Sequence, residues 1–330
     1  MRAVLYLARR LGHGLVVLFG VSALSFLLAE ASPGSVFDEL KLDPRVSPAT
    51  IEALREQYGL DRPLLEKYAH WVRSMARGDL GFSVTHNTPV GALLWPRARN
   101  TLMLTVTATT LAWVVAIPLG MWAASRRGAW PDRLTAGATT TLLAIPDLLV
   151  GLFLLLIAIR SGFFPTGGMV SLGFAEFGAW DKVKDVVSHF FLPVTALALI
   201  NLPVLVQHVR ASMIDVLQSP FMQGGRAMGL SERRLRLRYA WPVAANPMIS
   251  LLGLSLAALL SGSFVIETIM SWPGLGPLLL AAVVARDLHV VVGVVTCSTV
   301  LLIAGNLLAD ALLYWADPRI RLRQGKIGAG

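Results

Sequence analysis

The side chains that could do chemistry are sparse in this chain, and their spacing limits its function. Cys297 is the only cysteine and lies in an apolar run, which excludes an internal disulfide and a cysteine-based metal site. The six histidines, at positions 13, 70, 86, 189, 208 and 289, include no pair at metal-ligand spacing. The only Gly-Lys pair, Gly325-Lys326, is not part of a Gly-x-x-x-x-Gly-Lys-Ser/Thr phosphate loop. We therefore expect no catalytic residue, no metal and no cofactor bound by this chain.

Three acidic residues, Asp147, Glu267 and Asp310, stand within or at the ends of apolar runs. A carboxylate facing lipid is costly, so we expect these groups to face protein or a water-filled cavity. They could line a pathway or contact a substrate amine, or they could bond a neighbouring helix or lie near lipid headgroups. Glu267 and Asp310 lie about one turn from the ends of their runs, which favours a structural role. For Asp147, beside Pro146, both interpretations stay open.

The composition places these residues in a membrane. Of the 330 residues, 55% are hydrophobic but only 8% aromatic, and the mean hydropathy is +0.63. We predict an all-α membrane protein with six transmembrane helices, each long enough to cross about 30 Å of hydrocarbon. The predicted spans are 11–30, 100–124, 134–159, 189–209, 247–270 and 289–314. Prolines 118, 146, 193 and 203 fall within them, so we expect kinks there.

The first span has an alternative interpretation as a cleaved signal peptide. Two arginines precede it, and Ala29-Glu30-Ala31 resembles a signal-peptidase site. Its apolar stretch of about 18 residues is longer than the usual 7–15 of a signal core, which favours a retained anchor.

Basic residues predict the orientation of the spans. If the N-terminus is cytoplasmic, the cytoplasmic segments 1–10, 125–133, 210–246 and 315–330 hold 16 Lys and Arg against 4 Asp and Glu. This bias follows the positive-inside rule and predicts that both termini are cytoplasmic. It also explains the net charge of +9 without a nucleic-acid partner.

The chain divides accordingly into four regions. We expect a cytoplasmic tip with the first anchor at 1–30, an extracytoplasmic segment at 31–98, a transmembrane domain at 99–315 and a cytoplasmic tail at 316–330. The outer segment has the balanced charge of a soluble surface, and Pro48 to Tyr58 favours a short helix. We expect a small helical outer segment after the first span.

The cytoplasmic loop 210–246 carries the most informative pattern. A short helix should end at Gly229, since glycine adopts positive φ without strain. Ser231 should then cap a second, basic helix. The adjacent glycines Gly224 and Gly225 each disfavour a helix by about 1 kcal/mol relative to alanine, so the regularity of the first helix stays open. A plain basic hairpin would explain the charge but not this Gly and Pro punctuation.

This loop resembles the cytoplasmic signature of binding-protein-dependent ABC importers. Gly229 and Pro242 fall at the spacing of that signature, although the opening Glu-Ala-Ala and the Ile and Leu positions differ. The run Ala227 to Arg234 resembles the Ala-x-Gly-Leu-Ser-Glu-Arg-Arg of its peptide branch. Further motifs of the dipeptide, oligopeptide and nickel permeases match at 55–64, 78–81, 100–102, 117–120, 164–168, 271–276, 286–287, 306–310 and 317–321. They are similar to the subunit type that has the long outer segment.

The resemblance implies a type I ABC importer permease fold in the bacterial inner membrane. It implies a homologous second permease, expected to form a heterodimer, two cytoplasmic ATPase subunits that bind ATP and Mg²⁺, and an extracytoplasmic solute-binding protein. The residues expected to couple to the ATPase are Gln223, Gly224, Gly225, Arg226, Ala227, Gly229, Leu230, Ser231 and Glu232. Peptide is the expected substrate, with a nickel chelate or another solute as the alternative.

Three other functions compete with the importer. An ion-gradient-driven secondary transporter predicts an inverted repeat and discontinuous helices at the midplane, and the sequence shows neither. A membrane-embedded enzyme needs clustered His, Ser or acidic residues at one depth, which are lacking. A structural scaffold would not need the loop centred on Gly229.

Overall fold

The computed structural model describes residues 2–31 and 63–316 of the chain. They belong to two compact units, which are described separately: residues 1–101 with 273–303, and residues 102–272 with 304–330. The helix predicted between Pro48 and Tyr58 lies outside the described residues.

The first unit combines long helices with a short helix and a hairpin that lie between α1 and α5 in the chain. It contains α1 (Arg2–Ala31), α4 (Leu64–Met75), β1 (Phe82–Ser83), β2 (Thr88–Pro89), the start of α5 (Val90–Ser125), α13 (Leu275–Val284) and most of α14 (Leu288–Ala316). Phe26, Trp71 and Val292 form its buried cluster. The described part of the segment after α1 is helical at α4, in keeping with the helical elaboration expected there, although no helix was predicted at those residues. β1 and β2 form an antiparallel hairpin that the sequence did not predict. Ser83 fixes this hairpin by donating a 2.7 Å hydrogen bond to Asp287 Oδ2.

The second unit holds the remaining helices. It contains most of α5, α6 (Trp130–Ala144), α7 (Asp147–Ser161), η1 (Phe174–Glu176), α8 (Ala179–Leu217), α9 (Pro220–Ala227), α10 (Glu232–Arg234), the π-helical η2 (Leu235–Ala240), α11 (Trp241–Ala244), α12 (Asn246–Ile269) and the end of α14. Small residues let its helices pack closely. A Cβ on Gly120 would lie 2.7 Å from Val209, and one on Gly151 would lie 2.9 Å from Ile266.

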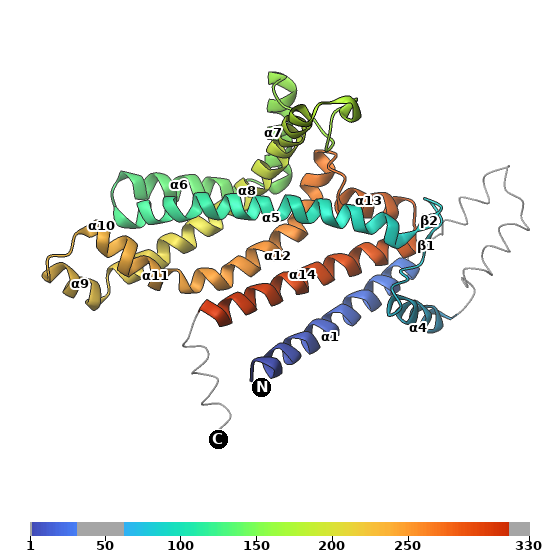
Figure 1. Ribbon diagram of the computed structural model, residues 1–330, viewed down its shortest axis with the longest axis horizontal. Helices are drawn as coiled ribbons and strands as arrows, with labels where there is room; N and C mark the ends of the chain where they lie inside the picture. The colour runs from blue at the N-terminus through green and yellow to red at the C-terminus, as the bar shows by residue number, and fades with distance from the viewer. Residues whose placement is uncertain (1, 32–62, 317–330) are drawn as a thin grey trace, which may run out of the picture. The chain divides into compact units, whose positions relative to one another are not determined.

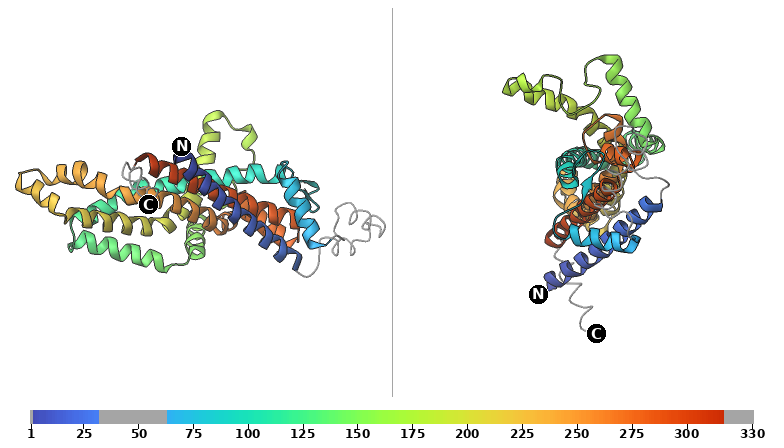
Figure 2. Two further views of the ribbon diagram at one scale, coloured as in Figure 1. Left: turned by 90° about the horizontal axis from the view of Figure 1, so that it is seen from below. Right: turned by 90° about the vertical axis from the view of Figure 1, so that its right-hand side faces the viewer.

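The predicted third span, 134–159, is not one helix. It consists of α6 and α7, whose axes differ by 99° (Figures 1 and 2). The break lies at Pro146, which lacks an N–H and disfavours helical backbone at the residue before it. Ile145 is indeed extended, with φ −87° and ψ 122°. By contrast, α8 continues through Pro193 and Pro203.

The other spans fall within continuous helices, but their number stays a prediction. In residues 2–31 and 63–316, four helices are long and apolar enough to cross a membrane, and the α6–α7 pair makes five if it counts as one span. These four lie in α1, α5, α8 and α14. The predicted span 247–270 coincides with α12 within one residue but is not among them. The protein is thus a helical, multi-pass membrane protein.

Candidate coupling site

The predicted first helix of the loop exists as α9, and it is regular despite its two glycines. Ser219 precedes it and Pro220 begins it, where a missing N–H does no harm. Met222 is fully buried against a cluster that includes Met213 and Leu235. The neighbouring Phe221 is 49% exposed. One face of α9 is therefore anchored to α8 and η2, and the other is open.

The two glycines of α9 differ in their surroundings. A Cβ on Gly225 would lie 2.7 Å from Leu235 Cδ2, so glycine allows α9 to contact η2 closely. A Cβ on Gly224 would meet nothing within 4 Å. The packing against Leu235 offsets the low helix propensity, which explains why the first helix is regular.

Gly229 has the left-handed backbone that the sequence predicted, with φ +76°. The Leu230 N–H donates to the Gly225 carbonyl at 3.2 Å, and the Gly229 N–H donates to the Arg226 carbonyl at 2.9 Å. These two bonds form a Schellman motif, which satisfies carbonyl groups left open at the helix end. Gly229 thus ends α9 and turns the chain back.

An ion pair closes this turn from the side. Arg226 Nε donates to Glu232 Oε1 at 2.7 Å, joining α9 to α10. The bond lowers the pKa of Glu232 and raises that of Arg226, so both groups are charged at neutral pH. Both side chains are about half exposed, so the pair contributes only about 0–1 kcal/mol. Ser231 occupies the predicted N-cap position but forms no capping side-chain hydrogen bond.

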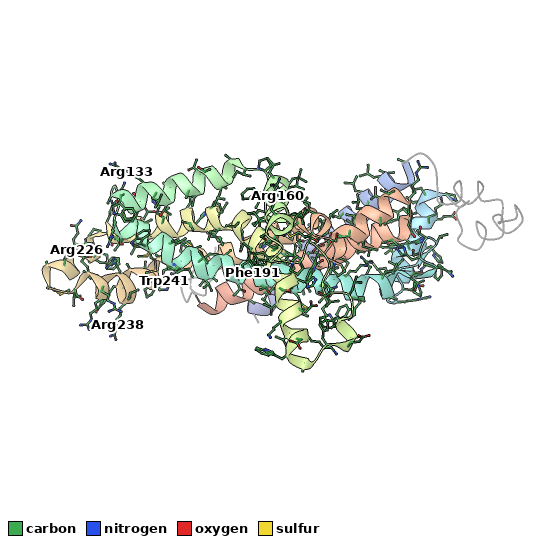
Figure 3. All side chains as sticks on the ribbon, turned by 90° about the horizontal axis from the view of Figure 1, so that it is seen from above. Arg133, Arg160, Phe191, Arg226, Arg238 and Trp241 are labelled. Atoms are coloured by element: carbon green, nitrogen blue, oxygen red, sulfur yellow. The ribbon has the colours of Figure 1, made fainter. Side chains whose placement is uncertain are left out.

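The second helical segment runs through α10, η2 and α11 without a break. Leu235 and Ala240 are buried and Arg236 is half-buried, while Arg233, Arg234 and Arg238 are exposed, as Figure 3 shows for Arg238. Ser212 on α8 donates to the Ala244 carbonyl at 2.9 Å and holds the end of the segment. Of the nine predicted coupling residues, Gly225 is buried, Leu230 is half-buried and the other seven are exposed.

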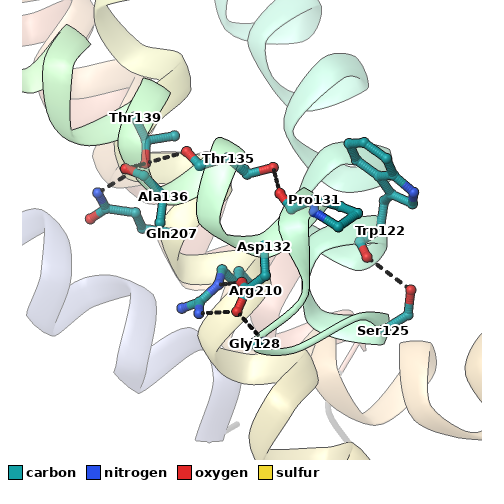
Figure 4. A network of polar contacts seen from close by, with 10 residues as sticks. All are labelled: Trp122, Ser125, Gly128, Pro131, Asp132, Thr135, Ala136, Thr139, Gln207 and Arg210. Atoms are coloured by element: carbon teal, nitrogen blue, oxygen red, sulfur yellow. Dashed lines mark hydrogen bonds and ion pairs between the residues drawn. The ribbon is translucent and has the colours of Figure 1, made fainter.

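A second polar cluster joins α6 to α8 (Figure 4). In the sequence, its charged residues Asp132 and Arg210 were recognised only as part of the charge bias of the loops. Asp132 accepts hydrogen bonds from Arg210 Nε and from Arg210 Nη2, the latter at 3.0 Å. It also accepts from the Gly128 N–H at 2.8 Å, which fixes the turn between α5 and α6. The signal in the sequence was Asp132 next to Pro131 in a first helical turn.

The three membrane acids differ in their surroundings. Glu267, on α12, is fully buried, so it faces protein as predicted. Asp147 begins α7 and is exposed on this chain, so its expected position against protein or a water-filled cavity stays a prediction. Its Oδ2 lies 4.0 Å from where a Cβ on Gly262 would stand. Asp310 belongs to α14, and its side chain lies outside what the structure describes.

Comparisons with known proteins cover nearly the whole chain. Residues 116–322 match the family described as binding-protein-dependent transport system inner membrane component, and residues 3–108 match its N-terminal membrane component. The chain is 36% identical to the oligopeptide transport system permease protein AppB of Bacillus subtilis, over 96% of this chain and 98% of the relative. It is 33% identical to the dipeptide transport system permease protein DppB of Escherichia coli K12, with the same coverage.

A further relative and a solved structure agree with these matches. The glutathione transport system permease protein GsiC of Shigella flexneri is 32% identical over 96% of this chain and 99% of the relative. A structure of the MetNI methionine ABC transporter, in an inward-facing conformation, matches with a TM-score of 0.56. That match is 14% identical and covers 68% of this chain and 96% of the other, so it bears on the fold alone.

Proposed function

Because the chain belongs to the family of binding-protein-dependent transport system inner membrane components, we propose that it forms half of the pathway of an ABC importer for peptides. The observation that carries this proposal is similarity over nearly the full length to permeases of oligopeptide and dipeptide transport systems. Their 32–36% identity extends across both units, so it includes the outer segment as well as the spans.

The loop from Pro220 to Ala244 is the proposed contact with an ATPase subunit. Its anchored face fixes α9 to α8, and its open face presents Phe221 and Met228, which are 49% and 76% exposed. Exposed apolar side chains next to a fixed turn suit insertion into a groove on a partner. ATP and Mg²⁺ are then bound by two such ATPase subunits, and this chain transmits their closure to the spans.

A homologous second permease completes the proposed pathway.

In this proposal, one of the two acids in the described spans has a role in helix packing and the other a role in transport. Glu267 is buried and supports the packing of α12. Asp147 stands beside the break at Pro146 on an exposed face, where it can line the pathway or meet the second subunit. Asp310 keeps a structural role near the cytoplasmic end.

The proposed setting is the bacterial inner membrane with both termini in the cytoplasm. Substrate is delivered from outside by a solute-binding protein, which selects the peptide. The charge bias of 16 basic to 4 acidic residues supports this orientation.

Reconstitution tests the proposal. The chain is co-expressed with a second permease and ATPase subunits, and the complex is placed in liposomes with labelled dipeptide, oligopeptide or nickel chelate and the binding protein. We expect ATP-dependent uptake of peptide by the complex and no ATP hydrolysis by the purified chain alone. Uptake by this chain alone, driven by a proton gradient, would identify a secondary transporter. Uptake of the nickel chelate but not of peptide would show that the substrate is a nickel chelate.

A further inference from the structure

A basic cavity lies in the second unit where the α5–α6 turn faces the coupling loop. Its volume is about 940 Å³. Four arginines line it, namely Arg126, Arg127, Arg226 and Arg236, together with a single acid, Glu232. Since Glu232 pairs with Arg226, the charges of the other three arginines leave the cavity with a net charge of +3.

Two of these arginines are available to a ligand. Within the part of the chain that the structure describes, Arg126 and Arg127 form no ion pair, and both are exposed. Three positive charges around one cavity repel each other, and among the described residues only Arg127 of the three has an electrostatic interaction with a nearby acid outside the lining, Asp132. Binding of an anion that neutralises them is therefore favoured. Arginine also presents a fork of donors that matches phosphate oxygens in pairs.

Contacts within the protein hold both walls of the cavity. Gly128 has a φ of +78°, and its N–H bonds Asp132, which is itself held by Arg210. Figure 4 shows the contacts among Gly128, Asp132 and Arg210. Arg126 and Arg127 directly precede Gly128 in the chain, so the same contacts fix the turn that carries them. On the opposite wall, the Arg226–Glu232 pair fixes α9 against α10. A fixed wall on each side reduces the entropy lost when an anion binds.

The neighbouring aromatic side chains place this cavity at the level of lipid headgroups. Trp122 and Trp130 flank the turn and pack edge to face, with ring centroids 5.5 Å apart. Trp130 is 63% exposed. Exposed tryptophan at the end of a transmembrane helix is typical of the membrane–water interface. Basic pockets at that level bind the phosphates of anionic lipids.

We propose that this cavity binds the phosphate headgroup of an anionic phospholipid such as phosphatidylglycerol. Arg126, Arg127 and Arg236 contact the phosphate, and the acyl chains leave along the side of Trp130. The bound lipid thereby links the α5–α6 turn to the coupling loop. This lipid site is additional to the proposed importer function. Lipid binding can be measured on the chain alone, so its failure would leave the importer proposal untouched.

Native mass spectrometry of the purified full chain tests the site. The chain is titrated with short-chain phosphatidylglycerol and, in parallel, with phosphatidylcholine of the same length. We expect tighter binding of phosphatidylglycerol. An arginine near an anionic headgroup contributes roughly fivefold in affinity, so R126Q/R127Q should weaken phosphatidylglycerol binding about 25-fold and leave phosphatidylcholine unchanged. Both side chains are exposed, so the fold should survive.

The matched control is R133Q/R234Q, which removes the same charge from exposed arginines that do not line the cavity. This variant should bind phosphatidylglycerol within twofold of the wild type. Equal effects of the two double variants would overturn the proposal in favour of general surface charge. If inorganic phosphate displaces phosphatidylglycerol and binds as tightly as the lipid does, the cavity is instead a site for free anions. If R126Q/R127Q keeps its lipid affinity but no longer co-purifies with the ATPase subunit, the cavity is a protein contact.

Discussion

The left-handed backbone of Gly229 places the turn between α9 and α10 under a constraint that only glycine meets without strain. Space is not the limit, because a Cβ there would meet nothing within 4 Å. The cost of a side chain is therefore purely conformational, about 1–2 kcal/mol and more for a β-branched residue. Its effect should concentrate on the direction in which α9 points.

We therefore expect Gly229→Val to abolish peptide uptake while the amount of protein in the membrane stays near normal. ATPase association should weaken, or hydrolysis should lose its stimulation by loaded binding protein. Gly229→Ala should be milder. Uptake by the assembled complex and pull-down of the ATPase subunit measure both effects.

Two controls separate coupling from strain. Gly173→Val imposes a similar strain, with φ +84° and open space, but on a turn that the charge bias predicts to face outward, so ATPase association should not change. Gly224→Ala places a methyl group in open space on α9 without strain, so it shows what an added methyl group on the exposed face of α9 does when the backbone is not strained. Normal uptake and assembly with Gly229→Val would show that the loop is only a basic hairpin without a role in coupling.

A second prediction concerns the contact between Gly225 and Leu235. A methyl group at 225 would overlap Leu235, which is only 1% exposed and has little room to move. Gly225→Ala should therefore destabilise the chain by about 1–3 kcal/mol, whereas Gly224→Ala should be neutral or slightly stabilising. Thermal unfolding in detergent measures the difference.

The double variant Gly225→Ala/Leu235→Ala makes the test specific. Leu235→Ala alone leaves a cavity, which costs about 2–5 kcal/mol. The added methyl partly fills that cavity, so the combined loss should be smaller than the sum of the single losses. Strict additivity would show that the two side chains do not interact.

At the residue scale, the sequence predicted what depends on local backbone and missed what depends on tertiary contact. The positive φ of Gly229 and the position of Ser231 follow from helix-end chemistry. The reason for Gly225 lies in a side chain ten positions away, which no local propensity reports. Ser231 occupies its predicted position but forms no capping side-chain hydrogen bond.

At the element scale, the pair Asp132–Arg210 connects the start of α6 to α8. Asp132 is 5% exposed and also holds the Gly128 N–H, so one carboxylate fixes a turn and a helix pair. Breaking such a pair leaves Arg210 without its counter-charge in a partly buried position. Periodicity in the sequence could not pair residues 78 positions apart.

We expect Asp132→Asn to destabilise the chain by about 1–3 kcal/mol, less than for a fully buried pair because Arg210 is 29% exposed. Asp181→Asn is the matched control, since Asp181 forms a surface pair with Lys184 at 3.7 Å and both side chains are over 60% exposed. It should change stability by less than about 0.5 kcal/mol. Equal melting temperatures of the two variants would show that the Asp132 pair does not hold α6 to α8.

Also at the element scale, hydropathy located the helices but not their breaks. Span lengths follow from apolar runs, so α5, α8 and α14 contain the predicted segments. Pro146 breaks its helix whereas Pro193 and Pro203 do not, although all three lie in similarly apolar stretches of the sequence. Pro193 and Pro203 are buried among neighbouring helices, which hold α8 together. Pro146 is exposed, so nothing comparable supports continuity there.

For the whole molecule, orientation is the property that decides which partner meets which surface. If the charge bias sets it, residues of the outer segment and of the loop after α7 face outward, and α9 faces the cytoplasm. Three exposed residues report these faces: Leu65, 82% exposed, Leu172, fully exposed, and Met228, 76% exposed. Each can be replaced by cysteine in a Cys297→Ser background.

In intact cells, an impermeant maleimide should label Leu65→Cys and Leu172→Cys, because an exposed thiol ionises near its ordinary pKa and reacts readily. Met228→Cys should be labelled only after the membrane is permeabilised. Permeabilised labelling of all three variants is the control for reactivity, and gel-shift or mass spectrometry reads the result. Labelling of Met228→Cys in intact cells, with Leu172→Cys protected, would invert the topology and place the candidate coupling loop out of reach of any cytoplasmic ATPase. Labelling of Leu172→Cys but not of Leu65→Cys would instead show that the first span does not cross as predicted.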